Sequence, residues 1–253
     1  RRRGSGDAPL EGNATETIDA TGKVVAPGFV DIHTHYDGQA TWDDAMEPSA
    51  GQGVGTAIMG NCGVGFAPVR PGHEDDLVKL MEGVEDIPGA ALHEGIRWNW
   101  ESFPQYMDAL AATPRSLDYL VQVPHDPLRM YVMGERALAH TTATPADIDA
   151  MRALLREALQ AGAAGLSTGR SDNHRTSEGK DTPAANASAQ ELSGIARAFE
   201  GLNHGVVQVV SDYNLLQGPA EFDAEFDLVE ALARTSGKPV SVTWLQRDPG
   251  GEQ

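Results

Sequence analysis

The chain has 253 residues, and its 19 Lys or Arg against 37 Asp or Glu give a formal net charge of −18. This acidic balance argues against nucleic acid and anionic membrane surfaces as partners, because both select basic patches. No run in the sequence approaches the roughly 20 apolar residues of a membrane span. Cys62 is the single cysteine, which excludes an internal disulfide and favours a reducing compartment, the cytoplasm.

The first predicted elements, at residues 17–19 and 23–25, flank a Gly22 turn and indicate a small hairpin. After them, short apolar and β-branched runs alternate with amphipathic segments, which is typical of a parallel sheet. Six such runs predict strands, at residues 29–32, 55–60, 119–123, 164–167, 206–210 and 240–245.

Four of the intervening segments predict helices that pack on this sheet. Residues 102–111 have helical spacing, and residues 144–162 begin with Thr144 as the N-cap. Ser188 and Glu191 predict a capping box for the next helix, and residues 222–233 predict a helix ended by Gly237. We expect the acidic runs 74–76 and 221–227 to be solvated faces. The connection at residues 66–100 is long enough to be a lid over a site.

The strongest chemical signal is Asp31-Ile32-His33-Thr34-His35, at the end of the first predicted strand. Side chains two positions apart on a strand point to the same face, so His33 and His35 can offer two imidazoles to one metal ion. The carboxyl end of a barrel strand is also the face where active sites form. This pattern favours metal binding over a chance pair of histidines.

A second signal, Gly60-Asn61-Cys62-Gly63, follows the second predicted strand. A free cysteine taken alone is usually a small buried hydrophobe. Its thiolate is nevertheless a good zinc ligand, and the flanking glycines allow close backbone approach. Because Cys62 is expected at the same end of the sheet as His33 and His35, we interpret all three residues as zinc ligands.

Weaker candidates follow the third and fourth predicted strands. His125 closes the third strand, while Arg170 and His174 lie at the end of the fourth or just beyond it. Arg170 could hold a substrate carboxylate through a bidentate pair. We expect these three residues to be substrate contacts, with an ordinary structural role as the alternative for each.

Residues 25–35 together with Gly60-Asn61-Cys62-Gly63 resemble the amidohydrolase superfamily, in its D-aminoacylase (N-acyl-D-amino-acid deacylase) branch. The likeness extends over most of the chain from about residue 17. It implies an α/β fold, a TIM-like (β/α)8 metal-dependent hydrolase barrel beside a small β-sandwich. Residues 1–25 would then belong to the sandwich and residues 26–253 to the barrel.

The resemblance also implies a reaction, the zinc-dependent hydrolysis of the linear amide of a small N-acyl-D-amino acid. The zinc ligands would be His33, His35, Cys62, histidines of strands five and six, and a strand-eight aspartate that is also the general base. The chain departs from this pattern at Gln208-Val209-Val210 and at Thr243-Trp244-Leu245, which contain no histidine. The number of zinc ions, one or two, therefore remains open.

Two other functions remain open from the residues alone. The missing histidines are compatible with a catalytically silent protein of the same fold that binds a ligand or a partner chain. A cyclic-amide hydrolase would need a metal-bridging lysine after the fourth strand, where Ser167-Thr168-Gly169 supplies none.

Six predicted strands are two fewer than an eight-stranded barrel needs. The sequence also starts with three arginines and no methionine. We therefore expect an incomplete barrel from a longer polypeptide, with the general-base aspartate beyond residue 253. The oligomeric state is not predicted.

Overall fold

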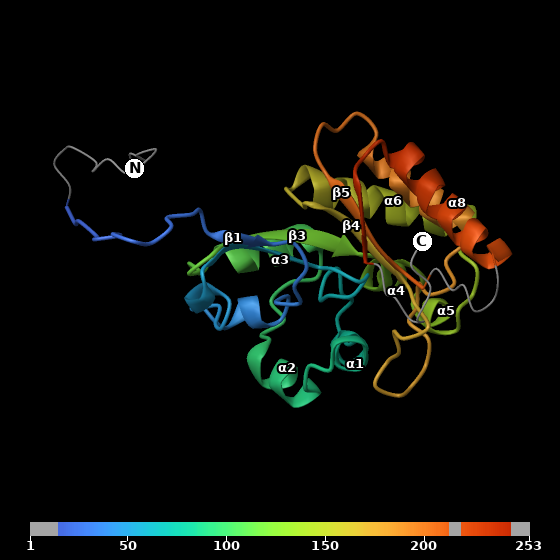
Figure 1. The fold of residues 1–253 in the computed structure, drawn as a ribbon. Helices are drawn as coiled ribbons and strands as arrows, with labels where there is room; N and C mark the ends of the chain where they lie inside the picture. Colours follow the sequence, from blue (N-terminus) through green and yellow to red (C-terminus); the bar gives the residue numbers. More distant parts are fainter. Residues whose placement is uncertain (1–14, 213–218, 244–253) are drawn as a thin grey trace.

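In this computed structural model, residues 15–212 and 219–243 are described, and they form a six-stranded parallel sheet. The strands follow each other in chain order, each hydrogen-bonded to the next, and Figure 1 shows the sheet curling along its length. They are β1 (Phe29–Asp31), β2 (Val54–Met59), β3 (Asp118–Pro124), β4 (Gly165–Arg170), β5 (Val206–Ser211) and β6 (Val240–Thr243). The predicted α/β fold, an incomplete barrel of six strands, is confirmed.

Helices connect the strands because parallel neighbours need crossovers. They are α1 (Glu74–Glu85), α2 (Gly89–Gly95), α3 (Phe103–Ala111), α4 (His125–Met133), α5 (Glu135–Leu138), α6 (Pro145–Gln160), α7 (Ala189–Ala196) and α8 (Pro219–Ser236). Helix α7 contacts both α6 and α8, and these helices cover the sheet at its β4 and β5 end (Figure 1). The core lies between the helices and the buried faces of the strands, and it extends into the connection between β2 and β3 through Phe66, Leu80 and Tyr106.

The predicted helix starts are confirmed for α3 and α6. Thr144 Oγ1 accepts a hydrogen bond from Asp147 N at 3.2 Å, and Asp147 Oδ2 accepts from Thr144 N at 2.8 Å. Only half of the capping box predicted for α7 forms, because Ser188 accepts from Glu191 N while the Glu191 carboxylate binds Arg129 and His125 in the interior. The sequence pattern could not show that a long-range partner competes for this carboxylate.

The predicted N-terminal hairpin is not formed in the described residues. Lys23 N donates to Ala20 O at 2.9 Å and closes the expected turn, but no strand flanks it. Ile18 and Val24 are 80% and 95% exposed, and this segment extends away from the sheet (Figure 1). A two-stranded hairpin is marginal without an apolar surface to pack on, and none contacts it here.

The long connection between β2 and β3 is folded rather than loose. Trp100 Nε1 donates to Phe66 O at 2.8 Å, and Tyr106 OH donates to Asp37 O at 2.7 Å. The rings of Trp98 and Trp100 pack beside each other, 5.6 Å between centroids. These contacts hold α3 and the segment before it against the loops that follow β1 and β2. The C-terminal end of α1 reaches the candidate site separately, through the contact between Glu85 and His35. None of the helices described is both long and apolar enough to cross a membrane.

Candidate metal centre

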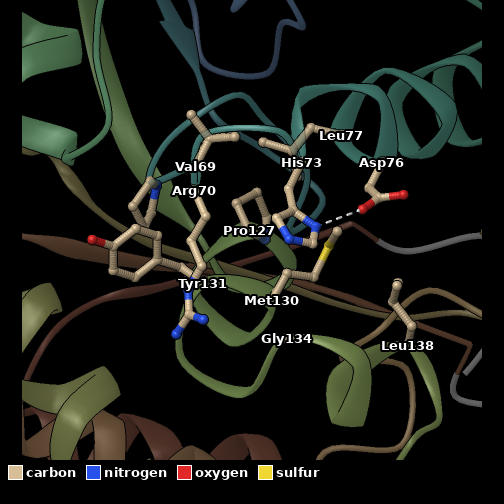
Figure 2. Close-up of a pocket in the computed structure, with 11 residues that line it drawn as sticks. Val69, Arg70, His73, Asp76, Leu77, Pro127, Met130, Tyr131, Gly134 and Leu138 are labelled. Carbon is tan, nitrogen blue, oxygen red and sulfur yellow. Dashed lines mark hydrogen bonds and ion pairs between the residues drawn. The ribbon is translucent and has the colours of Figure 1, made fainter.

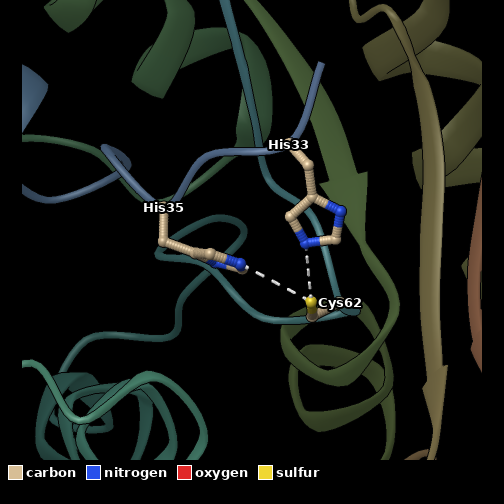
Figure 3. A group of neighbouring side chains, drawn as sticks. All are labelled: His33, His35 and Cys62. Atoms are coloured by element: carbon tan, nitrogen blue, oxygen red, sulfur yellow. Dashed lines mark hydrogen bonds between the residues drawn. The ribbon is translucent and has the colours of Figure 1, made fainter. Parts of the chain in front are cut away.

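His33, His35 and Cys62 converge at the carboxyl ends of β1 and β2 (Figure 3). His33 Nε2 lies 3.1 Å and His35 Nε2 lies 3.5 Å from Cys62 Sγ. Both histidines lie in the loop directly after β1, not within the strand as the spacing suggested. The loop nevertheless directs both imidazoles to one point, so the three predicted ligands are brought together.

Two glycines allow the Cys62 turn to lie against the neighbouring strands. Gly60 and Gly63 have φ of 76° and 78°, and Cys62 between them has φ of 59°. A Cβ atom on Gly60 would lie 2.2 Å from Gln122 O, and one on Gly63 would lie 2.7 Å from Gly169 N. The close backbone approach expected from the sequence therefore occurs, and it places Cys62 over β3 and β4.

Hydrogen bonds from β4 and β5 hold this turn in place. Cys62 N donates to Gln208 Oε1 at 2.8 Å, and Gly63 N donates to Ser167 Oγ at 3.0 Å. Gln208 Nε2 in turn donates to Thr243 Oγ1 at 3.3 Å, and Thr243 Oγ1 lies 3.4 Å from His33 Nδ1. Strands β5 and β6 thus support the cluster through polar contacts, whereas Trp244 lies outside the described residues.

The electrostatics of the cluster keep its groups neutral. Burial, followed by the proximity of His33 and His174, lowers the pKa of His35 to about 3. Burial and the nearby Glu85 carboxylate raise the pKa of the Cys62 thiol well above its usual range. A neutral imidazole keeps its lone pair for a metal, and a thiol that resists ionisation releases its proton when a cation binds. The donor set and its buried setting fit zinc, which prefers nitrogen and sulfur ligands.

Sequence reasoning missed Glu85, which is the last residue of α1. Its Oε1 atom lies 3.2 Å from His35 Nε2, and burial raises its pKa to about 7. No motif marks this residue, since it is 23 positions beyond Cys62 within the long connection. The length of that connection was the one sequence signal that pointed to it.

The three predicted substrate contacts occupy different environments. His125 is 0% exposed, with Nδ1 2.9 Å from Thr168 Oγ1 and Nε2 3.1 Å from Glu191 Oε1, so both ring nitrogens have partners inside the protein. His174 lies with the cluster, because its ring is within 4.8 Å of ligand atoms of Cys62 and Glu85. Burial lowers the pKa of His174 as well.

Arg170 does form the bidentate carboxylate pair for which it was singled out, but with a carboxylate of this chain. Its Nε and Nη2 atoms donate to Glu225 at 2.6 and 3.1 Å. Glu225 also accepts from Ser211 Oγ at 2.8 Å. The acidic run 221–227 is therefore not only a solvated face. A substrate contact through Arg170 stays a prediction.

A small pocket that is open to solvent lies outside the cluster, between the start of α1 and the helices α4 and α5 (Figure 2). Val69, Met130 and Leu138 give it apolar walls, and the Arg70 guanidinium lies 5.5 Å from the centre of the Tyr131 ring. It shares no lining residue with the His33, His35 and Cys62 cluster, so it is a separate pocket.

Comparison with known proteins shows the family. A family model described as amidohydrolase family matches residues 16–253. The chain belongs to the amidohydrolase family. Among curated relatives, the D-aminoacylase of Alcaligenes xylosoxydans xylosoxydans is 36% identical over 188 residues, which cover 74% of this chain and 34% of the relative. The N-acyl-D-aspartate deacylase of the same organism is 40% identical over 152 residues, or 60% of this chain and 28% of the relative.

A solved deacylase structure has a similar fold. The N-acyl-D-glutamate deacylase of Bordetella bronchiseptica, complexed with zinc and a phosphonate inhibitor, matches with a TM-score of 0.61 and 27% identity. The match covers 88% of this chain and 41% of the solved chain. The chain thus spans about a third of the length of the curated relatives named above.

Proposed function

We propose that this amidohydrolase-family protein hydrolyses the amide bond of N-acyl-D-amino acids with the help of zinc. The observation that carries the proposal is the convergence of His33, His35 and Cys62 at the carboxyl ends of β1 and β2. The relatives support the substrate class, since they are named as deacylases of N-acylated D-amino acids. They differ in the amino acid, so the side chain that this protein selects is left open.

His33, His35 and Cys62 would hold the zinc ion. Such an ion supplies Lewis-acid chemistry, polarising the scissile carbonyl and making water more acidic. Two neighbouring residues would orient the ligands. Thr243 lies against His33 Nδ1, and the Gln208 side chain accepts a hydrogen bond from the Cys62 main chain. These second contacts fix the direction of the ligand atoms, which is a common determinant of metal affinity.

The second candidate is a catalytically silent binding protein. The observation in its favour is that Gln208 within β5 and Thr243 at the end of β6 are the side chains of these strands that contact the cluster, and neither offers an imidazole. An amide and a hydroxyl support the cluster but are poor zinc ligands. A measurement of both metal content and turnover separates the two candidates.

The test uses the intact protein, its His33→Ala and Cys62→Ala variants, and His73→Ala as a matched control. His73 is an exposed histidine that pairs with Asp76 outside the cluster. We expect zinc in the parent and in the control, loss of zinc in the two cluster variants, and turnover of N-acyl-D- over N-acyl-L-amino acids. Unchanged zinc content in Cys62→Ala and His33→Ala would end the proposal, and zinc without turnover of any substrate would favour the silent protein.

A further inference from the structure

Two groups of possible ligands meet at Cys62. The first is His33, His35 and Cys62, and the second is Cys62, Glu85 and His174. Within each group, the ligand atoms lie within 4.8 Å of one another. The second group draws on different elements, the end of α1 and the loop after β4, and it was not predicted from the sequence as a metal site.

Glu85 is in a position that is unfavourable for a carboxylate without a cation. It is the last residue of α1, where the helix dipole disfavours negative charge, and the last turn of α1 contains no basic residue. Its side chain is 19% exposed and faces the His35 imidazole and the Cys62 thiol. A thiol and a carboxylate side by side become mutually stabilising when a divalent cation lies between them.

His174 can lie close to the Cys62 turn because the residue between them, Gly169, has no side chain. A Cβ atom on Gly169 would lie 2.4 Å from Cys62 O and 3.2 Å from His174 Nδ1, so a side chain there would enter between the turn and the ring. The buried Nδ1 atom of His174 has no hydrogen-bond partner among the residues described. A neutral imidazole is a common metal ligand, and one ring nitrogen of His174 lies within 4.8 Å of the ligand atoms of Cys62 and Glu85.

We propose that Glu85 and His174 are direct zinc ligands, which together with Cys62 form a second set of ligands beside His33 and His35. Carboxylate, imidazole and thiolate are all established zinc donors. Strands β5 and β6 offer an amide and a hydroxyl near the cluster, and the additional donors come instead from α1 and from the loop after β4. The inference rests on the proposed function, because it requires the cation that His33, His35 and Cys62 are proposed to hold.

The experiment measures zinc per chain and zinc affinity for the intact protein and for Glu85→Gln and His174→Gln. Glu82→Gln, one turn earlier on α1, and His73→Gln are the matched controls. Glu82 accepts a hydrogen bond from Gly89 N at 3.0 Å, which a glutamine oxygen can still accept. We expect zinc affinity to fall at least about tenfold in the two test variants and to stay unchanged in the controls.

A second readout is the thermal shift on adding zinc, since a ligand that binds only the folded state raises the unfolding temperature. The metal-free variants should unfold cooperatively, and the zinc-induced shift should shrink in Glu85→Gln and His174→Gln alone. Cobalt substitution adds a spectroscopic check, because loss of a ligand changes the d–d bands.

The outcomes separate this inference from the function that it deepens. Parental affinity, zinc content and thermal shift in both Glu85→Gln and His174→Gln, with zinc still lost in Cys62→Ala, would overturn the inference and leave the proposed function intact. Absence of zinc binding in the unmodified protein would overturn both.

Discussion

Asp126, in the first turn of α4, is a fully buried carboxyl group close to the Cys62 turn. Its main-chain N donates to Gly63 O at 3.0 Å, and its Oδ1 accepts from Ala184 N at 2.5 Å. Its Oδ2 atom has no hydrogen-bond partner in the described part of the chain. Burial raises the pKa of Asp126 to about 8, so the folded protein keeps a proton that the unfolded chain releases near pH 3.8.

This difference predicts a pH dependence of stability. Between about pH 4 and pH 8 the folded state binds more protons at Asp126 than the unfolded state, so the free energy of unfolding falls as the pH rises. Asp126→Asn should remove this fall, by up to about 1.4 kcal/mol for each pH unit. Urea unfolding of metal-free protein at several pH values measures it, with the exposed Asp149→Asn on α6 as the control. A parent and variant with parallel pH profiles would contradict the prediction.

At the residue scale, the sequence predicted those candidate residues that belong to a short local motif. His33 and His35 were singled out by their spacing, and Cys62 by its position after a predicted strand, and the structure brings the three side chains together. Glu85 was not found, because its approach to His35 depends on how α1 packs. His125 was singled out as a strand-end residue, and the structure shows it fully buried with Thr168 and Glu191 as partners of its two ring nitrogens.

At the scale of elements, the turn after β2 is the most constrained connection near the site. Gly63 combines a φ of 78° with a backbone atom only 2.7 Å from the position that a Cβ atom would take, whereas Gly72 has a φ of 88° and open space around it. Substitution of Gly72 therefore tests the cost of the left-handed backbone conformation alone. Substitution of Gly63 tests the same cost together with a steric collision.

We expect Gly72→Ala to cost on the order of 1–2 kcal/mol of unfolding free energy, from its left-handed conformation alone. Gly63→Ala adds a collision with β4 and should cost roughly 2–5 kcal/mol. It should also weaken zinc binding, since relief of the collision moves Cys62. Chemical unfolding and zinc titration test both effects. Equal costs for the two substitutions would show that close packing on Gly169 does not constrain this turn.

The six strands and four of the eight α-helices in the described residues, α3, α6, α7 and α8, were predictable because their signals are local, whereas α1, α2, α4 and α5 were not predicted. Apolar β-branched runs set β2 to β5, and side-chain caps set the starts of α3 and α6. The prediction of a hairpin at residues 17–25 was wrong, because a turn motif alone does not provide the apolar surface on which a two-stranded hairpin would have to pack. The predicted hydrogen bond from the Ser188 main chain to the Glu191 side chain does not form, because Glu191 instead binds Arg129 and His125, which are 62 and 66 residues away in the sequence.

At the scale of the whole molecule, a buried polar network joins elements that are distant in the sequence. Arg129 Nε donates to Glu191 Oε1 at 2.8 Å, which links α4 to α7, and His125 extends the network to Thr168 on β4. Arg129 also donates to Pro183 O at 3.0 Å and to Thr141 O at 2.6 Å. In a chain with a net charge of −18, this arginine neutralises a carboxylate that is 1% exposed.

Arg129→Met should therefore destabilise the fold strongly, because it removes a donor from the buried Glu191 carboxylate and from the carbonyl groups of Ala137, Pro183 and Thr141. Breaking a buried pair in this way costs about 3–5 kcal/mol. Arg152→Met is the matched control, since Arg152 pairs with Asp149 within α6 at the surface and such pairs contribute about 0.5 kcal/mol or less. Urea unfolding of metal-free protein measures both costs. Similar costs for the two substitutions would mean that the network adds no more than a surface ion pair, and that apolar packing alone holds α4, α7 and β4 together next to the candidate metal centre.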